Sequence, residues 1–123
     1  MEEMTKNVLG GVLQTCCTDP LTGFYRDGKC NTGPEDVGKH HVCVTMTEEF
    51  LLHQASIGND LITPRPQWGF PGLKPGDSWC VCTEMWKKSH EAGIRARVRL
   101  EATHENALED VTLEMLSQSA RLQ

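Results

Sequence analysis

The sequence lacks a long hydrophobic run, an excess of basic residues and the cysteine density of a disulfide scaffold. No stretch approaches the roughly 20 apolar residues that a membrane-spanning helix requires. The first residues contain no basic segment followed by an apolar core, which a secretory signal would show. Six cysteines in 123 residues fall below the density of about 8–10% that is typical of a disulfide scaffold. These absences predict a soluble cytoplasmic protein with no membrane association and with reduced thiols.

The charge balance argues against a nucleic-acid partner. Twelve lysines and arginines face 17 aspartates and glutamates, which gives a formal net charge of -5, whereas a general nucleic-acid binder needs a basic face to neutralise phosphates. Arg95, Arg97 and Arg99 alternate with apolar residues and so share one face of a predicted strand. That face is either solvated or a site for an anion or an acidic partner, and the sequence identifies no other partner.

The chain length corresponds to one domain. We predict a disordered tail over residues 1–6 and a single domain over residues 7–121. Residues 7–38 are rich in turn formers, including Asp19-Pro20 and Asp27-Gly28, and therefore predict a loop-rich N-terminal part. Residues 63–77 contain four of the six prolines, so this long connection is neither helix nor central strand. Its Trp68, Phe70 and Leu73 either anchor it to the core or form an exposed partner-binding loop.

Two strand and helix units follow the same plan. Residues 41–45 alternate like a strand, and Thr47 is typical of an N-cap for a helix that runs to about Ile57 and stops at Gly58. Residues 78–82 predict a second strand, with Thr83 as the cap of a helix that ends at Gly93. A third strand over residues 95–102, a short helix after Thr103 and a last helix after Thr112 complete the pattern.

These elements predict an α+β fold. We expect a single small domain with a small mixed sheet, two to four helices on one face, and the loop-rich N-terminal half covering an edge or the other face. The polar face of residues 95–101 argues against a fully covered parallel sheet. The alternative is an α/β arrangement of successive strand and helix units.

Three segments resemble a family of small, mostly bacterial proteins, catalogued as domain of unknown function 2237. They are CTDPLTGFYRDG at residues 17–28, GFPGLKPGD at residues 69–77 and LEATH at residues 100–104. The likeness covers residues 7 to about 120 and implies no activity. The resemblance places matching positions at Cys16, Asp19, Arg26, Asp27, Cys30, His40, Cys43, Cys80, Cys82 and His104.

The cysteines allow three interpretations. Cys43, Cys80 and Cys82 would share one patch if the two strands are neighbours, because residues two apart in a strand point the same way. With His40, or else His41 or His104, they would suit a tetrahedral zinc site, although Cys-x-Cys is not the usual zinc knuckle. Zinc is the one cofactor that the sequence suggests.

The second interpretation is thiol chemistry. Cys82 directly precedes a predicted helix N-terminus, and Cys30 lies near Arg26; a lowered thiol pKa at either position would suit a nucleophile or redox group. Neither has the spacing of a redox motif. The third interpretation is packing, because reduced cysteine behaves as a small hydrophobic residue.

A polar cluster marks the most promising cleft wall. Its members supply the acid, base and guanidinium groups that acid–base chemistry or anion recognition requires. As candidate catalytic residues we name Cys30, Cys82, Asp27 and His104. As candidate binding residues we name Cys16, Asp19, Arg26, Asp27, Cys30 and His104, with Glu35 and Asp36 nearby. The leading hypothesis is a non-catalytic binding or structural module with buried reduced cysteines; a metal-binding protein and a thiol-dependent enzyme or redox protein are the alternatives.

Overall fold

A three-stranded antiparallel sheet organises the chain. The computed structural model describes residues 5–120. The strands are β1 (Val42–Thr45), β2 (Ser78–Val81) and β3 (Arg97–Val98), and the helices are α1 (Glu48–Ser56), α2 (Thr83–Glu91) and α3 (Leu113–Ala120). The sheet order is β2-β1-β3, and β1 is antiparallel to both neighbours. The predicted α+β class is confirmed. The sheet is antiparallel rather than mixed, so the alternative of successive parallel strand and helix units is wrong.

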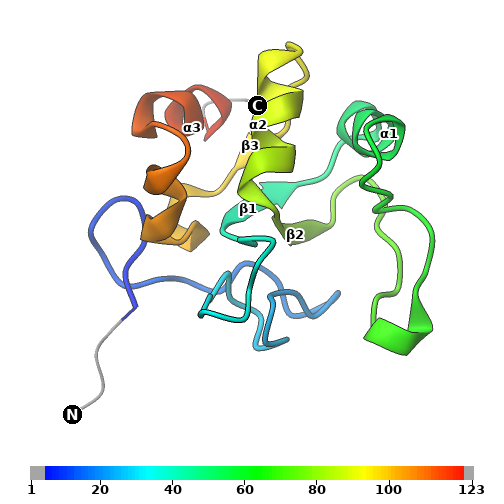
Figure 1. Ribbon diagram of the computed structural model, residues 1–123, viewed down its shortest axis with the longest axis horizontal. Helices are drawn as coiled ribbons and strands as arrows, with labels where there is room; N and C mark the ends of the chain where they lie inside the picture. Colours follow the sequence, from blue (N-terminus) through cyan, green and yellow to red (C-terminus); the bar gives the residue numbers. More distant parts are fainter. Residues whose placement is uncertain (1–4, 121–123) are drawn as a thin grey trace.

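The sheet is covered on both faces. Figure 1 shows the three helices on one side of the strands and the N-terminal loops, in blue and cyan, on the opposite side. The main core holds residues from the sheet and the helices, among them Val44, Phe50, Val81, Trp86 and Leu116. A second, smaller buried cluster contains Cys16, Cys30, Cys43, Cys80 and Ala102. The N-terminal half therefore has its own contact with the sheet.

Helix α1 forms where local signals predict it. The Thr47 side chain accepts a hydrogen bond from the amide of Phe50 at 3.1 Å, as an N-cap should. Glu48 and Glu49 lie in the first turn, where the helix dipole favours acids. The helix ends at Ser56, and Gly58 has the positive φ of +94° that follows many helix ends.

The second unit differs from its prediction at Cys82. Strand β2 ends at Val81, and Cys82 is the N-cap residue of α2. Thr83 is not the cap; its hydroxyl donates to the carbonyl of Lys39. The expectation that Cys80 and Cys82 share one strand face is therefore wrong, because the backbone turns into the helix between them.

The third predicted strand is also shorter than expected. Only Arg97–Val98 pair with β1, and a 3-10 turn follows at Leu100–Ala102. Further 3-10 turns lie at Pro66–Trp68 and Glu105–Glu109. Helix α3 begins as predicted, with the Thr112 hydroxyl accepting from the amide of Met115.

The connection between α1 and β2 reverses the chain direction. Phe70 and Leu73 are buried in the main core, whereas Trp68 is 67% exposed. Of the two interpretations left open by the sequence, anchoring to the core therefore holds for Phe70 and Leu73 and exposure holds for Trp68. The exposed Trp68 lies beside the cavity described below.

The terminal predictions fall partly outside the described residues. Of the tail predicted over residues 1–6, residues 1–4 are not described, and Lys6 forms an isolated β-bridge with Val12. Residue 121, the predicted end of the domain, also lies outside the described residues. Within residues 5–120, no helix has the length and apolarity needed to cross a bilayer.

Candidate functional site

Four of the six cysteines form two disulfides. Cys16 is bonded to Cys43 and Cys30 to Cys80, with sequence separations of 27 and 50 residues. The predicted buried reduced cysteines are thus not borne out, because Cys16, Cys30, Cys43 and Cys80 are buried as disulfides. Each bond joins the N-terminal loops to a strand, which ties this loop-rich part to the sheet.

The strand register brings the two disulfides side by side. Cys43 and Cys80 are direct partners in the antiparallel pairing of β1 and β2. Their backbone amides donate to the hydroxyls of Thr103 and Thr22, respectively. Thr22 comes from the N-terminal loops and completes the hydrogen bonding of β2, which is an edge strand.

Cys17 and Cys82 are free thiols. Among residues 5–120, the one group of three potential metal ligands consists of Cys16, Cys30 and Cys80. The predicted zinc set of Cys43, Cys80, Cys82 and His40 therefore does not converge in the described part of the chain; Cys80 instead meets two cysteines from the N-terminal loops.

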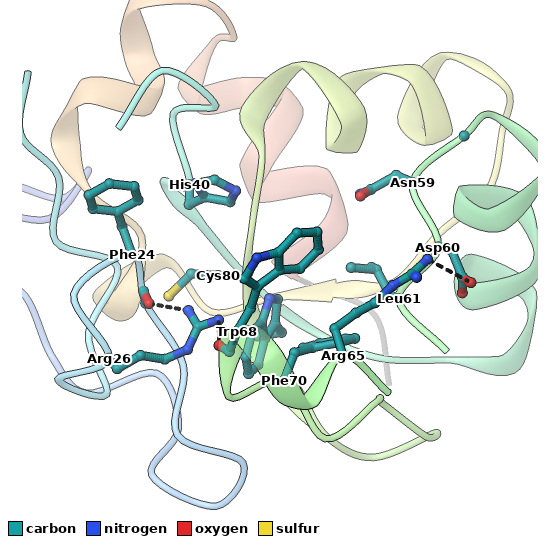
Figure 2. A pocket seen from close by; sticks show the side chains of 13 residues that line it. Phe24, Arg26, His40, Asn59, Asp60, Leu61, Arg65, Trp68, Phe70 and Cys80 are labelled. Carbon is teal, nitrogen blue, oxygen red and sulfur yellow. Dashed lines mark hydrogen bonds and ion pairs between the residues drawn. The ribbon is translucent and has the colours of Figure 1, made fainter. Parts of the chain in front are cut away.

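A cavity of about 380 Å³ lies at the β2 edge of the sheet. Figure 2 shows its lining, in which Trp68 stands near the centre with Arg26 beside it. The wall is formed by the N-terminal loops, the segment after α1, the proline-rich connection and β2. Its side chains are Phe24, Arg26, His40, Asn59, Asp60, Leu61, Arg65, Trp68, Phe70, Trp79 and Cys80.

Arg26 is the central polar group of this cavity. Its guanidinium lies 5.1 Å from the ring centroid of Trp79, a cation–π contact. It donates to the carbonyls of Gly23 and Trp68 at 2.6 and 3.2 Å. The Nε atom is buried without a hydrogen-bond partner, and no carboxylate of the described residues forms an ion pair with Arg26. Arg26 also has a φ of 54°, a left-handed conformation that is uncommon for such a residue.

The other ionisable groups of the cavity have partners. Nδ1 of His40 lies 2.6 Å from Oδ1 of Asp36, whose side chain is fully buried. Burial acts to raise the pKa of Asp36, but the hydrogen bonds from His40 outweigh it and hold that pKa below its usual range. Asp60 lies 3.9 Å from Arg65. Hydrogen bonds from the Thr63 side chain and backbone lower the pKa of Asp60.

The sequence predicted only part of this cavity. Arg26 and His40 were candidates, but Asn59, Asp60 and Arg65 were not. Four of the wall residues are tryptophan or phenylalanine. The one sequence feature that indicated an aromatic wall was the occurrence of these residue types in the proline-rich connection. The side chains come from five separate segments, so no spacing in the sequence unites them.

The remaining candidates lie elsewhere. Asp19 is exposed next to a cis Asp19-Pro20 bond. The Asp27 carboxylate accepts from the amide of Lys29 and from the Asn31 side chain, which is a turn-forming contact. Neither aspartate lines a described hollow. The predicted cleft wall thus divides, with Arg26 in the cavity and His104 in a second hollow.

That second hollow contains a pair of stacked histidines. The rings of His41 and His104 lie 5.5 Å apart, and both residues are buried. Nδ1 of His104 accepts from the amide of Asn106 and Nε2 of His41 lies 3.2 Å from the Thr32 hydroxyl, while Nδ1 of His41 has no partner. Burial, followed by the charge of His104, lowers the pKa of His41 to about 4. Burial also lowers the pKa of His104.

We expect stability to fall between pH 7 and pH 5. The unfolded chain binds a proton at His41 near its ordinary pKa of 6.5, whereas the folded protein resists protonation down to about 4, so stability is lost as the pH falls through this window. We expect a decrease of about 3–6 °C in melting temperature. The surrounding charges of Asp36, Asp110 and Lys39 modulate this pKa.

The variant His41→Asn tests the assignment, measured by thermal unfolding at both pH values. We expect its decrease in melting temperature to be less than half that of the unchanged protein, the rest arising from groups such as His104. Asp36 does not interfere, because its lowered pKa places its effect at more acidic pH. An unchanged pH dependence in the variant would show that His41 does not cause it.

Fold and site together define a small α+β protein with two disulfides and an aromatic cavity whose central arginine has no acid partner in the described part of the chain. Comparison with protein families extends this description. The model of the family DUF2237, described as an uncharacterized protein conserved in bacteria, matches residues 6–120. The chain belongs to this family, as the resemblance predicted. A comparison with curated proteins found no match.

Proposed function

We propose that the protein is a non-catalytic binding module whose cavity takes a small organic anion with a flat apolar group, such as an aromatic carboxylate. The observation that carries this proposal is Arg26. A partly buried guanidinium normally has a carboxylate partner, yet among residues 5–120 the polar and cation–π contacts of Arg26 are with carbonyl oxygens and the face of Trp79. A ligand carboxylate would supply the missing negative charge, because guanidinium groups match carboxylates in shape and charge.

The shape of the cavity supports a flat ligand. Its volume of about 380 Å³ lies within the range of about 300–1,000 Å³ for small-molecule sites. Phe70 and Trp79 are buried side chains of its wall, and their rings lie 5.1 Å apart in an edge-to-face arrangement. Trp68 is exposed and stands beside Arg26. An aromatic ring in the cavity would bury apolar surface against these side chains.

The charge of the lining supports an anion. The whole chain has a formal net charge of -5, but the cavity wall contains two arginines, Arg26 and Arg65, against one carboxylate, Asp60. That carboxylate is close to Arg65, at 3.9 Å. The uncompensated positive charge is therefore at Arg26.

We expect benzoate to bind the oxidised protein and the neutral analogue benzamide to bind at least about tenfold more weakly, since hydrogen bonds to charged groups contribute about 1.5–3 kcal/mol. Binding is measured by calorimetry and by tryptophan fluorescence, because Trp68 and Trp79 line the cavity. Arg26→Gln is expected to weaken benzoate binding at least tenfold. Trp68→Ala, a change at an exposed residue, should also weaken binding without lowering the melting temperature.

The matched control is Arg97→Gln, which removes the same charge from an exposed residue of β3 that does not line the cavity. We expect its benzoate affinity to stay within about twofold of the unchanged protein. Equal binding of benzoate and benzamide, or equal losses in the Arg26 and Arg97 variants, would contradict an anion site at Arg26. Absence of binding by benzoate would also contradict the proposal.

Two predictions from the sequence stay predictions. Cytoplasmic localisation is one; disulfides persist mainly in oxidising compartments, so two disulfides weigh against a form that is permanently reduced. A thiol-dependent enzyme or redox protein is the other. Cys17 and Cys82 are its available thiols, but neither lines the cavity that contains Arg26.

A further inference from the structure

We propose that the four disulfide cysteines, once reduced, form a binding site for one zinc ion. Sγ atoms of Cys16, Cys30 and Cys80 all lie within 4.8 Å of one another. Cys43 is the disulfide partner of Cys16 and belongs to the same buried cluster. Three sulfurs therefore converge at one point of the fold, and the fourth, on Cys43, is bonded to the sulfur of Cys16.

The spacing of the sulfurs suits zinc. In a tetrahedral site with zinc–sulfur bonds of about 2.3 Å, the sulfurs stand about 3.8 Å apart. Sulfurs of a disulfide stand about 2 Å apart, so each reduced pair must separate by about 1.8 Å to reach that value, and separations of up to 4.8 Å among the three sulfurs must close by about 1 Å. Rotation of cysteine side chains supplies such shifts without displacing the strands.

The backbone fixes the four cysteines independently of the disulfides. Cys43 and Cys80 are held by the register of β1 and β2, and their amides by threonine hydroxyls. The amide of Cys16 donates to the carbonyl of Gly28 at 2.7 Å, which connects the two loop segments that bear Cys16 and Cys30. None of these contacts involves a sulfur atom, so we expect them to persist when the sulfur–sulfur bonds are cleaved.

The surroundings resemble a closed structural zinc site more than a catalytic one. The four cysteines are at most 3% exposed, and the remaining member of their cluster is Ala102. A zinc ion with four thiolates carries two negative charges. Two arginines are close enough to compensate them: Arg99 donates to the carbonyl of Cys16 at 2.9 Å, and Arg26 lines the cavity beside Cys80.

The reaction needs a reductant of the low-molecular-weight thiol class. Each disulfide takes up two electrons and two protons from two thiols, which become one disulfide, so four thiols release four cysteines. One Zn²⁺ then replaces the four thiol protons, which pass to solvent, and four zinc–sulfur bonds form. Oxidation by a disulfide reverses these steps and expels the ion. The same four cysteines would thus form two disulfides in the oxidised protein and bind one zinc ion in the reduced protein.

This site differs from the zinc set predicted from the sequence, which combined Cys43 and Cys80 with Cys82 and His40. It is also independent of the proposed anion site, which belongs to the oxidised protein. Failure of either proposal leaves the other in place, because benzoate is tested without reductant and zinc is tested after reduction.

The experiment uses the full chain purified without a metal-affinity tag. The protein is reduced with a phosphine, desalted without oxygen and titrated with Zn²⁺ against a coloured chelator, and bound metal is counted by elemental analysis. We expect one zinc per chain, and alkylation that reaches Cys17 and Cys82 while the other four thiols are protected. Co²⁺ should give the spectrum of a tetrahedral thiolate complex.

The control variants separate this site from general thiol binding. Cys17→Ser and Cys82→Ser should retain one zinc, whereas Cys30→Ser should lower the affinity at least about 100-fold. The alkylation pattern of the unchanged protein provides the same test if Cys30→Ser does not fold. Less than half an equivalent of zinc, protection of Cys82 in place of Cys30, or loss of zinc in Cys82→Ser would overturn the proposal. Circular dichroism follows folding throughout; a reduced chain that unfolds and is not refolded by zinc would overturn it too.

Discussion

Cys80→Ser is expected to lower the free energy of unfolding by about 4 kcal/mol, because it removes a disulfide that closes a long loop. The bond from Cys30 to Cys80 spans 50 residues, and a cross-link of that length restricts the unfolded chain strongly. The variant also leaves a hydroxyl at a position that is 1% exposed, where a polar group without a partner costs stability. Denaturant unfolding in the absence of reductant measures the change.

Cys17→Ser is the matched control, because Cys17 is a free, partly exposed thiol. We expect its effect to stay within about 0.5 kcal/mol. Addition of reductant should bring the unchanged protein close to Cys80→Ser, since both then lack the bond. Equal stabilities of the two variants without reductant would contradict the disulfide assignment and the position of Cys80 on a core strand.

Gly23→Ala is expected to cost about 3 kcal/mol or more, since two unfavourable effects coincide there. Gly23 has a φ of +100°, and a Cβ at this position would collide with the carbonyl oxygen of Lys29. A backbone carbonyl cannot rotate away as a side chain can. Thermal and denaturant unfolding measure the loss of stability.

The same substitution should also weaken benzoate binding. Gly23 lines the cavity, and its carbonyl accepts hydrogen bonds from both the amide and the guanidinium of Arg26. Displacement of this loop therefore moves the arginine. A variant that folds at low temperature permits the binding measurement by calorimetry.

Gly10→Ala provides the control for the backbone conformation alone. Gly10 has a similar φ of +85°, but a Cβ there would meet no atom within 4 Å. We expect a cost of about 1 kcal/mol, the usual penalty of the left-handed region. Equal costs at Gly10 and Gly23 would show that the contact with Lys29 is not close enough to matter.

The helices were the most predictable part of the fold. Thr47 caps α1, Thr112 caps α3, and Gly58 and Gly93 have positive φ after their helices, as local signals indicated. Such signals depend on residues within one turn, so tertiary contacts rarely override them. The predicted boundary at Cys82 was wrong because β2 and α2 follow one another without a linker. An alternating pattern of residues does not show where such a strand ends.

The candidate site was predicted less well. Arg26 was identified as a candidate from its residue type. Its contact with Trp79 could not be predicted, because the two positions are 53 residues apart. Its neighbour Trp68 belongs to a segment for which the sequence left two interpretations open. The sequence analysis left open whether the two strands are neighbours, and the structure shows that they are, with Cys43 opposite Cys80. The predicted oxidation state of the cysteines was wrong. The reduced state was inferred from a compartment that composition indicated, and composition does not show which sulfur atoms lie within bonding distance of each other.

By itself, the sequence determined the α+β class, the family, the strands β1 and β2, the caps of α1 and α3 and the loop-rich character of the first part of the chain. The tertiary structure alone decided the antiparallel sheet, the pairing of Cys16 with Cys43 and of Cys30 with Cys80, and the cavity around Arg26. The physical reason is the distance along the chain over which each kind of interaction acts. Caps, turns and alternation act over a few residues, whereas disulfides and cavities depend on where segments dozens of residues apart come to lie when both faces of the sheet are buried.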